Sequence, residues 1–177
     1  MFQVKYSISP VQSSPNALFQ KALDAHRRGA FAQARNLYSQ VLGLQPAHSD
    51  TLHMLGVLEH SCSNHVLAID LISRAIALAP QNPSSYLNLA NAQKSLKLWD
   101  KALLSYERAI DIQPQYALAH SNRGALLHEM QRTDEALESL SKAIELNPNA
   151  ADTYFNRGNI YKDQHELDAA IAEYSMA

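Results

Sequence analysis

The chain has 177 residues, 46% of them hydrophobic, and a formal net charge of −2, so it lacks the excess of basic residues that nucleic-acid binding calls for. Its one cysteine, Cys62, excludes an intramolecular disulfide and is compatible with a reducing cytosol, so we expect a cytoplasmic protein. No run of about 18 apolar residues could span a membrane, so neither nucleic acid nor a membrane is an expected partner.

Residues 1–14 precede the first regular pattern of the chain. Val4, Tyr6 and Ile8 alternate with polar residues, which indicates an extended segment. Chain termini are rarely ordered unless another element holds them. We therefore expect an N-terminal tail or, alternatively, an arm that lies on its own helices or in the groove of a neighbouring molecule.

A pattern with a period of 34 residues occupies the rest of the chain, from residue 15 onward. A proline closes each of the first four units, and an alanine lies twelve residues before each proline. Large apolar residues recur in the second half of each unit and small residues in the first half. A fixed period of this length is typical of repeat proteins. The prolines are Pro46, Pro80, Pro114 and Pro148, the large residues are Tyr38, Ile72, Tyr106, Leu140 and Tyr174, and the small residues are Ala22, Gly56, Ala90, Gly124 and Gly158.

Each unit predicts two amphipathic helices joined by a short turn. Two helices approach closely only where side chains are small, which explains the glycine or alanine in the first helix. Proline lacks an N–H group and disfavours helix in the residue before it, so it ends the second helix. The expected helices are 16–28 and 31–44, 50–62 and 65–78, 84–96 and 99–112, 118–130 and 133–146, and 152–164 and 167–177.

Three positions along these helices carry further expectations. Gly29 suits the turn of the first unit. Trp99 begins the second helix of the third unit, and we expect it to be buried, like Phe31 and Leu167 at the same position. Thr133 is expected to cap the N-terminus of its helix, because acidic residues follow it.

These coinciding patterns resemble the tetratricopeptide repeat family over residues 15–177. The resemblance implies an all-α, right-handed superhelical solenoid of tandem helix-turn-helix repeats. In this family the first helices line a concave face, and positions 2, 5, 6, 9, 12 and 13 of each repeat should point into it. The repeats are 15–48, 49–82, 83–116 and 117–150, which are complete, and 151–177, which is partial.

The last repeat ends within its second helix, where Ala170, Ile171, Tyr174 and Ala177 have no later helix to cover them. Terminal repeats of a solenoid normally need a polar capping helix. We therefore expect the chain to be the N-terminal part of a longer protein. Alternatively, it forms a homo-oligomer through this C-terminal end or through the N-terminal arm.

Asparagines recur at position 6, on equivalent points of successive first helices. An asparagine amide offers both a donor and an acceptor, so it can pair with the main chain of an extended peptide of any sequence. The pattern is similar to the asparagine ladder of O-linked N-acetylglucosamine transferases and importin-like solenoids. The alternative interpretation is a solvated polar face. The candidate groove residues are Asn88, Asn122 and Asn156 at position 6, Asn91 and Asn159 at position 9, and Phe155 at position 5.

Basic or titratable residues occupy position 12 in every repeat. They predict a mildly cationic track that strengthens below about pH 6.5, or else scattered surface residues. A metal site is not expected, because equivalent positions of neighbouring repeats lie roughly 10 Å apart. The pair His60 and His65 also lacks a helical i, i+4 spacing and a carboxylate to complete a ligand set. The position-12 residues are His26, His60, Lys94, His128 and Lys162.

The family members that grip a chaperone tail hold its carboxylate with lysines, an arginine and asparagines. The matching positions here keep the asparagines and lack all three cations, so this mode of binding is not expected. The matching residues are Leu87, Asn91, Asn122, Asp152 and Asn156.

Arg123 and Arg157 stand where the family usually has leucine. We expect their aliphatic stems to pack between helices while the guanidinium groups form ion pairs. Candidate partners are Glu129, Glu135 and Asp163.

No sequence motif for catalysis, phosphate binding or metal binding is present, so no catalytic residue, cofactor or metal is expected. The sequence predicts a scaffold that binds an extended peptide or a partner helix in its concave groove. The alternative is the N-terminal, substrate-recruiting region of a larger enzyme, such as a glycosyltransferase, whose catalytic part lies outside this chain.

Overall fold

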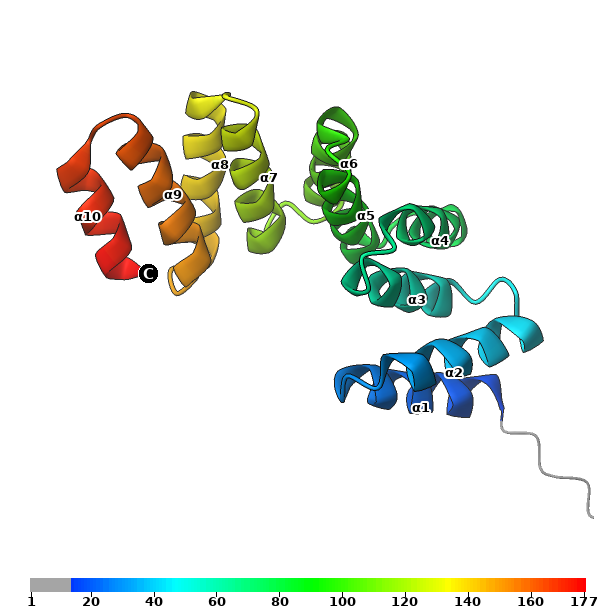
Figure 1. Ribbon diagram of the computed structural model, residues 1–177. Helices are drawn as coiled ribbons and strands as arrows, with labels where there is room; N and C mark the ends of the chain where they lie inside the picture. The colour runs from blue at the N-terminus through cyan, green and yellow to red at the C-terminus, as the bar shows by residue number, and fades with distance from the viewer. Residues whose placement is uncertain (1–13) are drawn as a thin grey trace, which may run out of the picture.

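The computed structural model describes residues 14–177, and within this range the chain forms ten α-helices and no strand (Figure 1). The helices pair into five hairpins that follow one another along a curve. The first helices of the hairpins are α1 (Pro15–Arg27), α3 (Ser49–Ser61), α5 (Pro83–Ser95), α7 (Ala117–Glu129) and α9 (Ala151–Asp163). The second helices are α2 (Phe31–Leu44), α4 (His65–Leu78), α6 (Trp99–Ile112), α8 (Thr133–Leu146) and α10 (Leu167–Met176).

The bounds of the second helices agree with the sequence prediction, except that α10 ends one residue early, at Met176. Each first helix begins one residue earlier than predicted, at the first position of its repeat. Pro15 and Pro83 occupy that position, where the missing N–H group costs nothing. Asn82 caps α5 by accepting hydrogen bonds from the N–H groups of Ser84 and Ser85.

Ser14 also caps a helix, since its hydroxyl accepts a hydrogen bond from the N–H of Ala17 at 3.3 Å. This residue therefore belongs to the start of α1, although the sequence-based boundary placed it in the N-terminal segment. The expected tail or arm otherwise falls on residues 1–13, which lie outside the described residues.

The two helices of a hairpin touch where the sequence has small residues. A Cβ atom on Gly56 would lie 2.5 Å from Cγ1 of Ile72, and one on Gly158 would lie 2.6 Å from Cε1 of Tyr174. A Cβ cannot fit at such distances, so the glycines set the spacing of these helices. The sequence explained these small residues by the close approach of the paired helices, which these contacts confirm. The side chains that meet the glycines are the large residues of the second helix, which the sequence did not pair with them.

The turn between paired helices places one residue of every repeat in the left-handed region. Only the first repeat has a glycine there, and the other residues bear a cost of roughly 1 kcal/mol each. The sequence predicted a turn in every repeat and singled out a turn residue only at Gly29. The residues and their φ angles are Gly29 (74°), Ser63 (65°), Lys97 (57°), Gln131 (62°) and His165 (62°).

The first helices form the inner layer of the curve. Helix α3 approaches both α1 and α5, and α7 approaches α9, whereas no two second helices within residues 14–177 come comparably close. A row of hairpins bends toward the layer whose members lie nearest to one another. The residues predicted to line the concave face therefore lie on the inner helices (Figure 1).

Two clusters of buried apolar side chains hold the hairpins together. The N-terminal cluster joins repeats 1 and 2, and the C-terminal cluster joins repeats 3, 4 and 5. The N-terminal cluster comprises Ala22, Ala25, Ala34, Tyr38, Leu52, Leu55, Leu58, Leu71 and Ala75. The C-terminal cluster comprises Leu87, Ala90, Ala102, Leu103, Tyr106, Ala109, Ala119, Leu126, Leu127, Ala136, Leu140 and Ile160.

Two sequence predictions about the second helices are wrong. Trp99, Phe31 and Leu167 are exposed rather than buried, because each is the first residue of its helix and lies at the solvent edge of the hairpin. Thr133 does not cap α8, because Arg132 occupies the cap position and no side chain there accepts a helix N–H. Arg132 instead donates two hydrogen bonds to the Glu135 carboxylate, at 2.7 and 2.6 Å.

Candidate functional site

A groove of about 740 Å³ lies along α7 and α9 on the inner face of repeats 4 and 5. Helices α5, α7 and α9 and the segment 147–150 contribute its walls. The structure brings six of the ten candidate site residues together there, namely Asn122, Asn156, Asn159, Phe155, Lys94 and His128. The other four, Asn88, Asn91, His60 and Lys162, do not line it.

Asn91 links repeats 3 and 4 beside this groove. Its side-chain oxygen accepts a hydrogen bond from the Tyr106 hydroxyl at 2.6 Å and another from Nδ2 of Asn122 at 3.2 Å. Burial raises the pKa of Tyr106, so the hydroxyl keeps its proton and remains a donor. The bond recurs in repeat 5, where Tyr174 donates to Asn159 at 2.8 Å. The position-9 asparagines are therefore held in fixed orientations by tyrosines of the second helices.

The position-6 asparagines differ in how much of each amide is already used. Nδ2 of Asn88 donates to Nε2 of His53 at 2.9 Å, and burial lowers the pKa of His53, which favours the neutral, accepting form. Asn122 uses its N–H₂ group for Asn91 and keeps its carbonyl oxygen. The Asn156 side chain forms no hydrogen bond with any other part of residues 14–177. Asn156 thus has a whole amide to offer to a ligand, and Asn122 has an acceptor.

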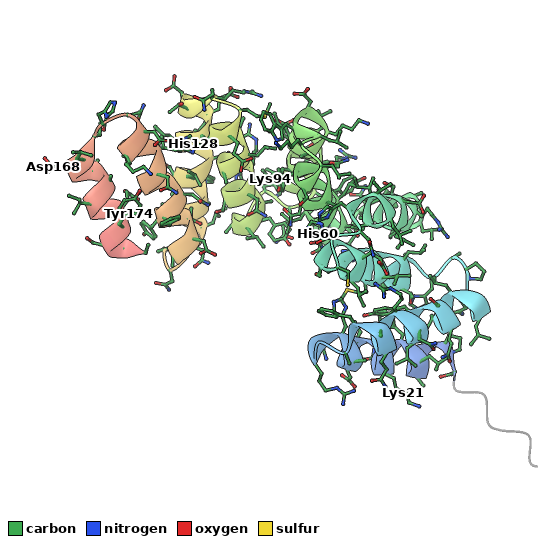
Figure 2. All side chains as sticks on the ribbon, viewed as in Figure 1. Lys21, His60, Lys94, His128, Asp168 and Tyr174 are labelled. Atoms are coloured by element: carbon green, nitrogen blue, oxygen red, sulfur yellow. The ribbon has the colours of Figure 1, made fainter. Side chains whose placement is uncertain are left out.

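Carboxylates lie beside two of the five position-12 residues. Lys94 lies 2.7 Å from Glu129, and Nε2 of His128 lies 3.2 Å from Asp163. Lys94 and His128 are labelled in Figure 2. Both carboxylates stand at position 13 of the following repeat, because position 12 of one first helix lies beside position 13 of the next. At Lys94 and His128 a neighbouring carboxylate thus offsets the positive charge that the sequence predicted, whereas Lys162 forms no ion pair within residues 14–177.

His60 faces His65 rather than the groove. Their Nδ1 atoms lie 3.0 Å apart, so one ring donates and the other accepts. Burial lowers the pKa of His60, and the nearby His65 lowers it further. Across residues 14–177 no group of three or more His, Cys, Asp or Glu side chains is placed to hold a metal ion. None of the helices in that range combines the length and the apolar character that crossing a membrane needs.

Arg157 and Arg123 form the kind of contacts that the sequence predicted, but with other partners. Arg157 binds the Glu173 carboxylate through two hydrogen bonds, at 2.9 and 2.8 Å, and also reaches Ser141. Arg123 donates to Ser139 and lies 3.6 Å from Glu107. All of these partners belong to second helices. The predicted carboxylates are therefore wrong, since Glu129 and Asp163 lie on first helices.

Sequence reasoning missed a buried ion pair between repeats 1 and 2. Arg35 of α2 donates to both oxygens of Glu59 of α3, at 2.5 and 3.1 Å, and Asn64 donates to the same carboxylate at 2.7 Å. The Glu59 side chain is 3% exposed, and the Arg35 hydrogen bond lowers its pKa. The sequence did carry a signal for this residue. Glu59 is a charged residue at a position where repeats 1 and 4 have the apolar Ala25 and Leu127.

Comparisons with known proteins agree with this geometry. The family pattern described as tetratricopeptide repeat matches residues 19–83, and the one described as TPR repeat matches residues 94–131 and 126–165. The crystal structure of MamA superposes with a TM-score of 0.78 at 24% identity over 88% of this chain and 91% of that one.

Two further solved structures share the fold. PilF of Pseudomonas aeruginosa gives a TM-score of 0.83 at 21% identity over 92% of this chain and 74% of its own. YrrB, described as a TPR protein with an unusual peptide-binding site, gives 0.72 at 19% identity over 90% and 82%. At these identities the similarity shows a common fold.

Proposed function

The chain belongs to the tetratricopeptide repeat family, and from this premise we propose that it is an interaction scaffold that binds an extended peptide in the groove along α7 and α9. The observation that carries the proposal is the pair of position-6 amides in the groove wall. Asn156 keeps both its donor and its acceptor, and Asn122 keeps its acceptor. An extended peptide exposes main-chain N–H and C=O groups that such amides can pair with.

The groove wall is also held in place before any ligand arrives. Asn91 fixes the Asn122 amide, and Tyr174 fixes that of Asn159. The Phe155 ring packs against Tyr174, with ring centroids 5.7 Å apart. Side chains that are already ordered lose little conformational entropy when a ligand binds, which favours affinity. The peptide-binding site ascribed to YrrB supports the same use for this fold.

Selection from a phage-displayed library of random peptides would test the proposal. The full chain is immobilised, and a selected peptide is then titrated into the wild type and into the double variant Asn122→Ala/Asn156→Ala. Loss of two amides should weaken binding roughly 10- to 30-fold, since each net hydrogen bond contributes about 1 kcal/mol.

The matched control is Asn16→Ala/Asn36→Ala, which removes two exposed amides from α1 and α2 and should leave the affinity unchanged. Equal affinity of the groove variant and the wild type would refute the proposal. Substrate recruitment for a larger enzyme, the alternative expected from the sequence, remains a prediction that no observation in residues 14–177 favours.

A further inference from the structure

The charged groups of the groove do not balance. Lys94 of α5 is engaged by Glu129 of α7, and His128 of α7 is engaged by Asp163 of α9. The remaining charged residue in the wall, Asp152, takes part in no ion pair with any of residues 14–177. The groove wall therefore presents one carboxylate without an ion-pair partner, at the N-terminus of α9, and no free cation.

Apolar surface lies next to this carboxylate. Phe155 follows Asp152 by three positions on α9, so the two side chains share one face of the helix. Leu118 of α7 also lines this end of the groove. Both Phe155 and Leu118 are 53% exposed. Tyr174, labelled in Figure 2, supports the Phe155 ring from α10 and leaves the rest of it accessible.

This combination matches one class of side chain. Lysine and arginine have an aliphatic stem that can cover Leu118 and Phe155 and a cationic head that can reach Asp152. A cation over an aromatic face gains a further attraction, and arginine gains most from it. An acidic side chain would meet Asp152 and Glu129, and it would find the Lys94 ammonium already occupied.

We infer that the groove selects extended peptides that carry a lysine or arginine side chain at the Asp152–Phe155 end. The inference rests on the proposed function and names the chemical class of its ligand. The partner it describes is a protein with an exposed, extended basic segment. Asp152 supplies the counter-charge, Phe155 the stacking surface, and Asn122 and Asn156 the contacts to the main chain.

Three acetylated and amidated peptides would test this inference. Their common sequence is GSAAXAASG, where X is arginine, alanine or glutamate, and each is titrated into the full ¹⁵N-labelled chain. The amide resonances of Phe155 and Asn156 report on binding in the groove. We expect the arginine peptide to bind about tenfold more tightly than the glutamate peptide, with alanine between them.

Two outcomes would contradict this expectation in different ways. An alanine or glutamate peptide that matches the arginine peptide would overturn the basic selectivity and leave peptide binding intact. If none of the peptides moves the groove resonances, both the selectivity and the proposed function are contradicted.

Two substitutions locate the preference within the groove. Asp152→Asn should reduce the ratio between the arginine and glutamate peptides to about twofold. The control Asp134→Asn makes the same charge change at the second residue of α8, outside the groove, and should keep the tenfold ratio. Phe155→Leu should weaken the arginine peptide about threefold while the alanine peptide is unaffected. An unchanged ratio in Asp152→Asn would contradict the role assigned to that carboxylate.

Discussion

Repeats 1 and 2 differ from repeats 3 to 5 in where their polar groups lie. In the N-terminal pair, the inner helices carry Phe19, Leu23 and Met54 against the N-terminal cluster, and the exposed Arg35 binds the buried Glu59 carboxylate between the repeats. In the C-terminal three, the inner helices carry asparagines and exposed ion pairs along the groove, and the less exposed pair of Arg157 with Glu173 lies inside repeat 5. Polar residues thus join neighbouring hairpins in both regions, and in the C-terminal region they also line an accessible groove.

The largest effect should come from the buried pair of the N-terminal region. Glu59→Ala removes three hydrogen bonds and leaves Arg35, which is 42% exposed and can regain water. We expect a loss of about 2 to 3 kcal/mol in the free energy of unfolding by urea. The corresponding C-terminal change, Glu107→Ala, removes an exposed partner of Arg123 and should cost less than about 0.5 kcal/mol.

The pH dependence of the unfolding free energy also reports on the Glu59 carboxylate. The pKa of Glu59 is lower in the folded chain than in the unfolded chain, so its contribution to stability is complete above the unfolded pKa. That contribution is lost as the pH falls from there through the folded pKa. Unfolding free energies measured from pH 6 downward should therefore decline less steeply in Glu59→Ala than in the wild type. Parallel curves would show that Glu59 is not the group that couples the repeats.

A smaller effect should separate the tyrosines of the two regions. Tyr106→Phe removes the 2.6 Å hydrogen bond to Asn91 and should cost about 1 kcal/mol. Tyr38→Phe in repeat 1 removes a 3.3 Å contact with His26 and should cost about half as much. Urea unfolding compares the two variants directly. A larger cost for Tyr38→Phe would contradict the view that the tyrosine–asparagine bond is a device of the C-terminal repeats.

Substitutions at the left-handed turn residue should have opposite effects on stability in the two regions. Lys97 has a φ of 57°, which glycine adopts without strain, so Lys97→Gly should raise the unfolding free energy by about 0.5 to 1 kcal/mol. Gly29→Ala, at the same position of repeat 1, should lower it by about 1 kcal/mol. Thermal melting checks both signs, and a stabilising Gly29→Ala would show that the turn does not hold that backbone conformation.

The smallest effect should come from His53 at the junction of the two regions. Burial lowers its pKa in the folded chain below the unfolded value of about 6.5. The free energy of unfolding therefore falls as the pH drops from about 6.5 toward the folded pKa, because the unfolded chain binds the proton more readily than the buried ring does. Asp50 opposes this shift in part. His53→Gln keeps an acceptor for Asn88 and should lose this pH dependence between pH 7 and 5. An unaltered slope in that variant would assign the titration to another group.

The repeat itself was predictable from the sequence, because the causes of its helices are local. The paired helices approach closely at the small residues, as predicted, and the bounds of the first four second helices agreed to the residue. The lateral contacts were not predicted, because they depend on the offset between neighbouring repeats. The pair of Lys94 with Glu129 becomes visible only when position 12 of one repeat is compared with position 13 of the next. Glu59 was missed for the same reason, because its partner Arg35 lies on the second helix of the preceding repeat.

The central claim is that a ligand occupies the inner face of repeats 4 and 5. A peptide selected for binding to the full chain, and carrying a nitroxide spin label, would test this claim. The label broadens the amide resonances of the residues that lie near the bound peptide. We expect broadening at Asn122, Phe155 and Asn156 on α7 and α9. Broadening confined to the second helices α6 and α8, or to repeats 1 and 2, would contradict the account.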